Sequence, residues 1–200
     1  MVRDGIHYAL ALIAAAALLG WLSGFLFAFP LLLAAVFCLW FFRDPDRPIP
    51  AGDLAVSPAD GRVLAVSSES PTLTRVSVFM NIFDVHVNRA PVAGRIAALD
   101  YRKGRFLIAS RDRAALENEQ NTVTIDAGNG AQVTFKQIAG LIARRIVFYK
   151  QPGDFVALGE RVGLIKFGSR VDVFLGPEWQ VQVRQGQRLR AGSSILAHRR

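Results

Sequence analysis

The chain predicts a mainly β domain, an antiparallel barrel or sandwich, that follows N-terminal hydrophobic membrane helices. Three observations support this prediction. No Asp, Glu, Lys or Arg occurs between Gly5 and Phe42. The proline-rich stretch Arg43–Pro50 then starts an extended polar connection. Behind it, short apolar runs rich in β-branched residues alternate with Gly and Pro, which is typical of antiparallel sheets. The 200 residues suit one compact domain with a short appendage.

The charge-free segment is expected to enter a membrane. A bilayer core takes about 20 helical residues, so the segment is too long for one crossing and short for two. Because Pro30, with Gly20 and Gly24 before it, offers a natural break, we predict helices near 8–28 and 31–42, as a hairpin or as one span with one interfacial helix. A cleaved signal peptide is the alternative, but the apolar run exceeds the usual length of about 7–15 residues.

Positive charge flanks the hydrophobic segment on both sides, at Arg3 and at Arg43 and Arg47. Basic residues favour the cytoplasmic side, so we expect a cell (inner) membrane protein whose folded domain faces the cytoplasm. The predicted domains are therefore membrane-anchoring helices over 1–45 and a folded domain over 46–200.

The composition limits the classes of molecule that this protein is expected to bind. The net charge of +8 and the pI of about 10.5 favour an anionic surface. Nucleic acid is not expected, because no helix-turn-helix, RNP-like or zinc-finger pattern occurs, and an anionic phospholipid membrane is the better partner. Cys38 is the single cysteine, and His7, His86 and His198 are scattered, so no metal site is predicted.

The individual strands follow from β-type runs between turn residues. Only residues 110–119 suit a helical turn or two. The predicted strands are Arg62–Ser67, Thr74–Phe79, Gly94–Leu99, Thr122–Asp126, Gln132–Ile138 and Arg144–Phe148.

An internal repeat adds detail near the C-terminus. Residues 153–164 and 186–197 both read Gly-polar-x-apolar-x-x-Gly-polar-x-apolar, with glycines six apart. This spacing resembles the hairpins of biotinyl/lipoyl-like barrels, where glycines permit tight turns with positive φ. The second copy contains the bond Gly192–Ser193 at a turn position, whereas Gly168–Ser169 lies outside both copies.

The tripeptide Phe167-Gly168-Ser169 lies between two apolar, β-rich runs. A Gly-Ser bond in such a setting is where a protein can cut itself and convert the serine into a pyruvoyl group. Gly-Ser is also a common turn dipeptide. Because the repeat explains Gly192–Ser193 as a turn, Gly168–Ser169 is the better candidate for chemistry.

Seven motifs, in the expected order, resemble those of short-form phosphatidylserine decarboxylase proenzymes. They extend over essentially the whole chain, and the joint match is specific although each motif alone is not. The motifs are residues 42–50, Ser57-Pro-Ala-Asp-Gly-Arg-Val63, 79–91 with Phe-Asp-Val-His-Val-Asn-Arg-Ala-Pro, 117–121, Lys136-Gln-Ile-Ala-Gly140, 163–169 and Arg170-Val-Asp-Val-Phe-Leu175.

The resemblance implies a decarboxylase that converts phosphatidylserine to phosphatidylethanolamine and CO2. Its cofactor would be a covalent pyruvoyl group made from Ser169, which forms a Schiff base with the substrate amine; no metal and no pyridoxal phosphate are expected. Self-cleavage would leave a large chain, 1–168, and a small chain, 169–200, as a heterodimer.

The resemblance also implies the residues around the bond. Asp60 matches an aspartate of a cleavage triad, although Asp-Gly is also a common turn. His86 is implied as catalytic, either in proton transfer or in orienting the substrate carboxylate, although a lone strand histidine is often structural. Longer members carry a second histidine three residues on, where this chain has Arg89. The base for self-cleavage therefore stays open.

Several readings remain beside this one. Five basic residues are candidates for contact with the lipid phosphate or the membrane, and each is explained equally well as an ordinary surface charge: Arg89, Lys136, Arg144, Arg145 and Lys166. Asn118 and Asn121 are candidate loop-shaping groups near the site. An archaetidylserine decarboxylase and a non-catalytic, membrane-anchored lipoyl-like module are the alternative functions.

Overall fold

A computed structural model describes residues 1–111, 113–141, 145–166 and 168–200. The chain divides into two compact units, Met1–Asp46 and Arg47–Arg200.

The first unit is a pair of packed helices, α1 (Arg3–Ser23) and α2 (Phe25–Phe41). The prediction that the break lies at Pro30 is wrong, because α2 contains this proline and the chain turns at Gly24 instead. Gly24 has a φ of 95°, which glycine adopts without steric cost. Pro30 lies early in α2, where it removes one backbone hydrogen bond and the remaining turns continue.

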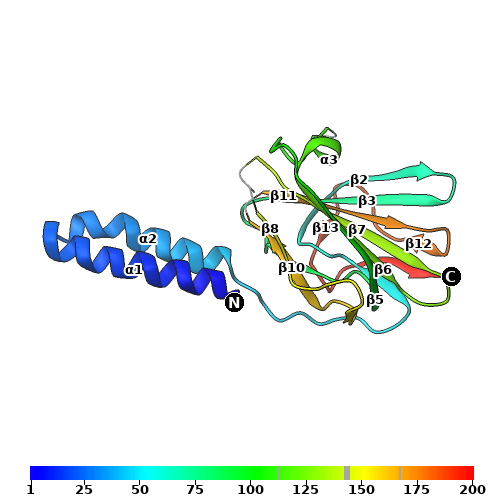
Figure 1. The fold of residues 1–200 in the computed structure, drawn as a ribbon, viewed down its shortest axis with the longest axis horizontal. Helices are drawn as coiled ribbons and strands as arrows, with labels where there is room; N and C mark the ends of the chain where they lie inside the picture. The colour runs from blue at the N-terminus through cyan, green and yellow to red at the C-terminus, as the bar shows by residue number, and fades with distance from the viewer. Residues whose placement is uncertain (112, 142–144, 167) are drawn as a thin grey trace. The chain divides into compact units, whose positions relative to one another are not determined.

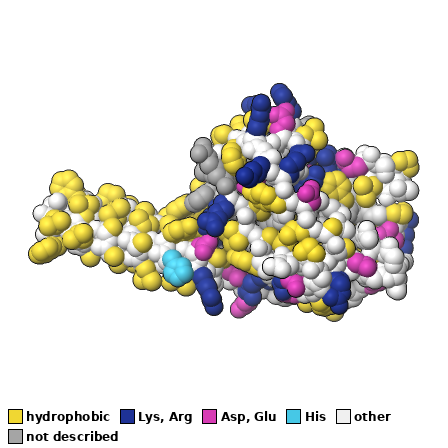
Figure 2. Space-filling model, viewed as in Figure 1, with side chains coloured by type: hydrophobic (Ala, Val, Ile, Leu, Met, Phe, Trp, Pro, Cys, Tyr) yellow, Lys and Arg dark blue, Asp and Glu magenta, His cyan; other side chains and the backbone are white. Residues whose placement is uncertain are grey.

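Most side chains of the first unit are apolar and exposed. Trp21 is 82% exposed and Leu26 is 80% exposed, and Figure 2 shows hydrophobic side chains covering the pair. Within the described residues, α1 with 21 residues is the one helix long and apolar enough to cross a bilayer, and α2 with 17 residues is shorter. An apolar surface of this kind is stable in lipid rather than in water.

The second unit is built from antiparallel sheets and is mainly β, as predicted (Figure 1). Its largest sheet has eight strands in the order β13-β2-β3-β11-β7-β6-β5-β9, and two three-stranded sheets have the orders β1-β14-β12 and β4-β10-β8. The elements are β1 (Leu54–Val56), β2 (Gly61–Ser70), β3 (Leu73–Met80), β4 (Val87–Arg89), β5 (Gly94–Arg102), α3 (Ala114–Glu117), β6 (Gln120–Asp126), β7 (Gln132–Ile138), β8 (Ile146–Phe148), β9 (Phe155–Val156), β10 (Arg161–Ile165), β11 (Ser169–Leu175), β12 (Trp179–Val181), β13 (Arg188–Leu189) and β14 (Ile195–Arg199).

The six predicted strands correspond to β2, β3, β5, β6, β7 and β8, with ends that differ by at most three residues. Arg144, the predicted start of the last one, lies outside the described residues. The short helix α3 falls inside the predicted helical stretch 110–119. The β-type runs between turn residues therefore located these strands.

Strand β11 lies in the middle of the large sheet, between β3 and β7. Val171, Val173 and Leu175 on one face of β11 belong to the hydrophobic core. Side chains alternate along a strand, so Ser169 projects from this same inner face. The strand that begins at the predicted cleavage site is thus a central structural element.

The repeat glycines adopt the predicted positive φ, at 97° and 70° for Gly153 and Gly159 and at 81° and 76° for Gly186 and Gly192. The resemblance to biotinyl/lipoyl-like hairpins stays a prediction. The second glycine of each repeat copy packs against the Ile49 side chain. A Cβ added at Gly159 would lie 2.6 Å from Ile49, and a Cβ added at Gly192 would lie 2.9 Å from it. The two turns therefore meet at one place.

Candidate active site

Ser169 is the first residue of β11 and lies opposite Met80 of β3. Its side chain is fully buried, and its hydroxyl has no hydrogen-bond partner among the described residues. A buried hydroxyl without a partner costs about 1–3 kcal/mol, so such a group is rare unless it has a chemical task. Ser193 is only partly buried, but its hydroxyl oxygen also lacks a partner among the described residues, so a hydroxyl without a partner does not by itself choose between the two Gly-Ser bonds.

The carbonyl group of Gly168 is enclosed by a second glycine. Gly168 has a φ of 51°, in the left-handed region that favours glycine. A Cβ added at Gly140 would lie 1.8 Å from the Gly168 carbonyl oxygen, so the chain at Gly140 touches this oxygen as only glycine can. Phe167, the third residue of the predicted motif, lies outside the described residues.

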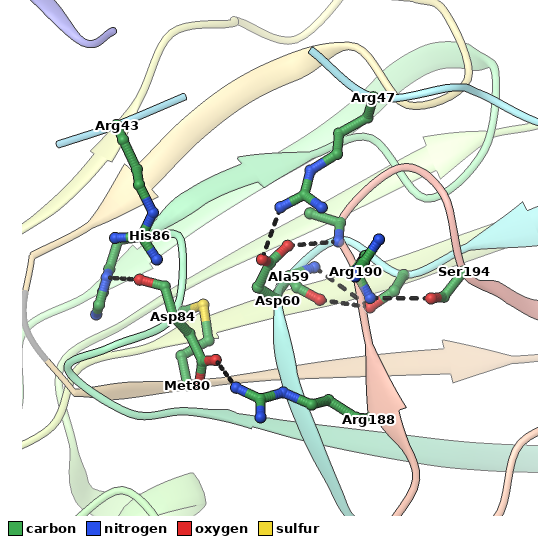
Figure 3. A network of polar contacts seen from close by, with 12 residues as sticks. Arg43, Arg47, Ala59, Asp60, Met80, Asp84, His86, Arg188, Arg190 and Ser194 are labelled. Atoms are coloured by element: carbon green, nitrogen blue, oxygen red, sulfur yellow. Dashed lines mark hydrogen bonds and ion pairs between the residues drawn. The ribbon is translucent and has the colours of Figure 1, made fainter. Parts of the chain in front are cut away.

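His86 is 2% exposed and lies beside the strand that leads to Ser169. Its carbonyl oxygen accepts a hydrogen bond from the Ile165 amide at 3.3 Å, at the end of β10. Its Nδ1 is 2.9 Å from the carbonyl oxygen of Asp84 (Figure 3). A carbonyl oxygen only accepts, so Nδ1 carries the hydrogen in this contact, and the neutral ring has its lone pair on Nε2. Among the described residues, no hydrogen bond joins the His86 ring to the Ser169 hydroxyl.

Asp84 has a role that the sequence motifs did not reveal. It is 5% exposed and closes the turn that follows β3, since its carboxylate accepts from the Asn81 amide at 2.9 Å. The other carboxylate oxygen is 3.2 Å from Nη2 of Arg188. Asp84 thus links the turn between Met80 and His86 to β13, which fixes the position of His86 (Figure 3).

Asp60 lies on the opposite side of this network. Its Oδ2 is 2.8 Å from Nη2 of Arg47, and its Oδ1 accepts from the Ala191 amide at 2.7 Å (Figure 3). Ala191 directly precedes the rival bond Gly192–Ser193. Among the described residues, Asp60 is not hydrogen bonded to the Ser169 hydroxyl, so Asp60, His86 and Ser169 do not form one hydrogen-bonded chain.

Arg89, which takes the place of a second histidine, is buried and points to the repeat turns. Its Nη1 donates to the Gly159 carbonyl at 3.0 Å, and its Cδ would lie 2.8 Å from a Cβ at Gly192. Arg89 therefore fastens the two turns and gives this chain a structural contact at that position.

A buried row of amides lies on the inner face of the sheet near Ser169. Asn121 donates to Gln137 at 2.9 Å, and Gln137 donates to Asn88 at 2.8 Å. Asn88 Nδ2 is also 3.9 Å from the sulfur of Met80, the strand partner of Ser169. Asn88 and Gln137 are fully buried, and the sequence motifs contain both without indicating this contact. Buried amides with satisfied partners fix one arrangement of a site.

Asn118 connects the segment before β6 to the site. Its side chain bonds both backbone groups of Leu107, at 2.8 Å each, and donates to the Ala139 carbonyl at 2.7 Å. This confirms a loop-shaping contact for Asn118, and Asn121 belongs to the amide row.

The outer face of the same strands carries charge. Arg170 and Asp172 form a buried pair at 2.6 Å, and Arg170 also donates to Ser77 at 2.9 Å. Lys136 lies opposite Asp172. Burial lowers the pKa of Lys136, and the neighbouring arginines oppose its charge further, although Asp172 favours it. Of the basic candidates for lipid contact, Arg144 lies outside the described residues.

Comparison with known proteins shows the family of this chain. A sequence model of phosphatidylserine decarboxylase matches residues 34–197. A phosphatidylserine decarboxylase proenzyme of Solibacter usitatus is 66% identical over 199 residues, which covers 100% of this chain and 97% of that protein. Proteins with the same name are 49% identical over 172 residues in Ruegeria pomeroyi (81% and 78% covered) and 43% identical over 213 residues in Erythrobacter litoralis (97% and 86% covered). The chain belongs to the phosphatidylserine decarboxylase family, as its motifs predicted.

Proposed function

We propose that this protein decarboxylates phosphatidylserine to phosphatidylethanolamine and CO2 with a pyruvoyl group that it makes from Ser169. One observation carries the proposal: the fully buried Ser169, whose hydroxyl has no partner among the described residues, follows a left-handed glycine whose carbonyl oxygen packs against Gly140. It does so in a chain whose relatives are named proenzymes of this activity.

The geometry suits self-cleavage between Gly168 and Ser169. The Ser169 oxygen attacks the Gly168 carbonyl carbon, the peptide C–N bond breaks, and the chain is then joined through an ester. Elimination across the Cα–Cβ bond of residue 169 breaks the ester and leaves Gly168 with a free carboxylate. Water then replaces the nitrogen of the new dehydroalanine, ammonia leaves, and a pyruvoyl group remains. Gly168 has no side chain to obstruct the attack, and the Ser169 hydroxyl has no hydrogen bond to a described residue that it would have to give up.

The pyruvoyl carbonyl supplies an electron sink for the pair of electrons left when CO2 departs. His86 is the residue that we propose for proton transfer at the reacting carbon, since its Nδ1–Asp84 contact leaves the lone pair on Nε2. For Asp60 we propose a positioning role, because its two contacts hold Arg47 and the segment before Gly192.

Cleavage would leave the chains 1–168 and 169–200 associated. β11, in the small chain, forms antiparallel ladders with β3 and β7 of the large chain, and β14 forms one with β1. The apolar helix α1 supports our proposal that the enzyme is held at a cell membrane with its folded unit on the cytoplasmic side.

Intact mass and denaturing electrophoresis of the purified protein test the proposal. We expect a large chain that ends at Gly168 and a small chain that starts at residue 169 and resists Edman degradation. Ser169→Ala should abolish both cleavage and decarboxylation, while Ser193→Ala should retain both. An intact chain with an unmodified Ser169, or cleavage at Ser193, contradicts the assignment.

A further inference from the structure

Four large apolar side chains of the second unit are exposed in segments that converge on the Gly168–Ser169 bond. Phe83 is 67% exposed, Ile108 is 42%, Leu116 is 72% and Leu141 is 55%. We call these four residues the apolar rim. Single exposed apolar side chains are common, but several around one site mark a binding surface.

Short contacts connect the apolar rim to the bond. Leu141 follows Gly140, which touches the Gly168 carbonyl oxygen. Ile108 precedes Ala109, whose Cβ would lie 3.4 Å from a Cβ at Gly140.

The other two rim residues are placed by neighbouring turns. Leu116 belongs to α3, which ends one residue before Asn118, and Asn118 binds Ala139. Phe83 lies in the turn directly after Met80, the strand partner of Ser169.

Basic residues accompany the rim on the same segment. Residues 103–117 contain four basic residues, Lys103, Arg105, Arg111 and Arg113, against two acidic ones. The side chains of Arg105 and Arg113 are 72% and 77% exposed, although both contact Glu117. Figure 2 shows basic side chains next to hydrophobic ones at the edge of the folded unit where Figure 1 places α3.

We propose that the apolar rim and the basic residues of 103–117 dock the folded unit onto an anionic phospholipid bilayer, around the Gly168–Ser169 bond. This inference rests on the proposed function, because that substrate is a lipid. Withdrawing a lipid from a bilayer exposes its acyl chains at about 0.8 kcal/mol per CH2 group. A docked rim lets the head group reach Ser169 while the chains remain in lipid. Each basic residue adds about 1 kcal/mol of attraction to an anionic surface.

A fluorescent label tests docking without any need for activity. In the full chain with Cys38→Ala, Leu116→Cys carries an environment-sensitive fluorophore, and the protein is reconstituted in liposomes. Phe155→Cys is the matched control. The Phe155 side chain is 63% exposed, but it lies on β9 opposite Arg95, at the end of β5 that is farther from residue 103.

We expect a blue shift at position 116 when liposomes contain equal parts of phosphatidylglycerol and phosphatidylcholine, compared with phosphatidylcholine alone, and none at 155. Equal emission at the two positions overturns the proposal. A shift that follows the protein-to-lipid ratio instead of the lipid composition also overturns it, and indicates a second copy as the partner.

A kinetic experiment separates docking from chemistry. For Ile108→Ser with Leu116→Ser, the apparent KM for phosphatidylserine in liposomes should rise by about tenfold, since burial of each side chain in lipid is lost. The kcat for a dispersed short-chain phosphatidylserine should stay within about twofold of wild type, because the reacting groups are untouched. Equal losses on both substrates overturn docking. A wild-type protein inactive on both would contradict the proposed function, while the fluorescence still decides docking.

Discussion

Replacement of Gly140 by alanine tests whether the position of the Gly168 carbonyl group controls self-cleavage. The added Cβ would lie 1.8 Å from the carbonyl oxygen, whereas Cβ atoms essentially never come closer than 3.0 Å to another atom. The oxygen or the chain at residue 140 must therefore move by about 1.2 Å, the difference between these distances. A displacement of about 1 Å from the reactive geometry typically lowers a rate by roughly a hundredfold. We therefore expect Gly140→Ala to slow cleavage between Gly168 and Ser169 by roughly a hundredfold.

The rate is measured by intact mass at intervals after cell-free synthesis, beside the thermal unfolding midpoint of each variant. Gly94→Ala is the matched control, because its Cβ would lie 2.1 Å from the Asp126 carbonyl oxygen, and Asp126 lies at the opposite end of β6 from Gln120, which pairs with Ile138. Wild-type cleavage kinetics in a folded Gly140→Ala protein would refute the reasoning. An equal slowing in Gly94→Ala would show that the effect is a general loss of folding.

Three further predictions concern charged side chains. Asp60→Asn should lower the thermal midpoint, because a neutral amide replaces the carboxylate that binds Arg47 and the Ala191 amide, and should still permit cleavage; a stable Asp60→Asn protein that fails to cleave would instead place Asp60 in the cleavage chemistry. Asp172→Asn should cost about 3–5 kcal/mol in chemical denaturation, because it leaves the buried Arg170 guanidinium without a negative charge beside it; the control Asp53→Asn, which weakens an exposed ion pair with Arg199 at 3.8 Å, should cost less than about 1 kcal/mol. Lys136→Met should raise the thermal midpoint at neutral pH, because burial lowers the pKa of Lys136 and its charged form destabilises the fold. That penalty is complete below the folded pKa and is lost as the pH rises through it, so the gain should shrink toward the ordinary lysine value of 10.5. A lower midpoint at neutral pH would contradict the Lys136 prediction.

The sequence by itself determined the elements and the family. Strand positions, the charge-free N-terminal segment and the Gly168–Ser169 bond are local patterns, because side-chain alternation and turn glycines depend on neighbouring residues. The glycines of the repeat adopt positive φ as their spacing predicted. The predicted position of the break between α1 and α2 was wrong. Both Gly24 and Pro30 can interrupt a helix, and a local pattern does not say which of them ends it.

The tertiary structure decided which distant residues meet. Strand register places Asn88 next to Gln137, brings Gly140 against Gly168, and ties Asp60 to Ala191. None of these pairs has a local signal, because the residues lie far apart in sequence and touch only after antiparallel strands have paired. The same pairing gave Ser169 a buried hydroxyl without a partner among the described residues, and gave Asp60 its contacts with Arg47 and the Ala191 amide.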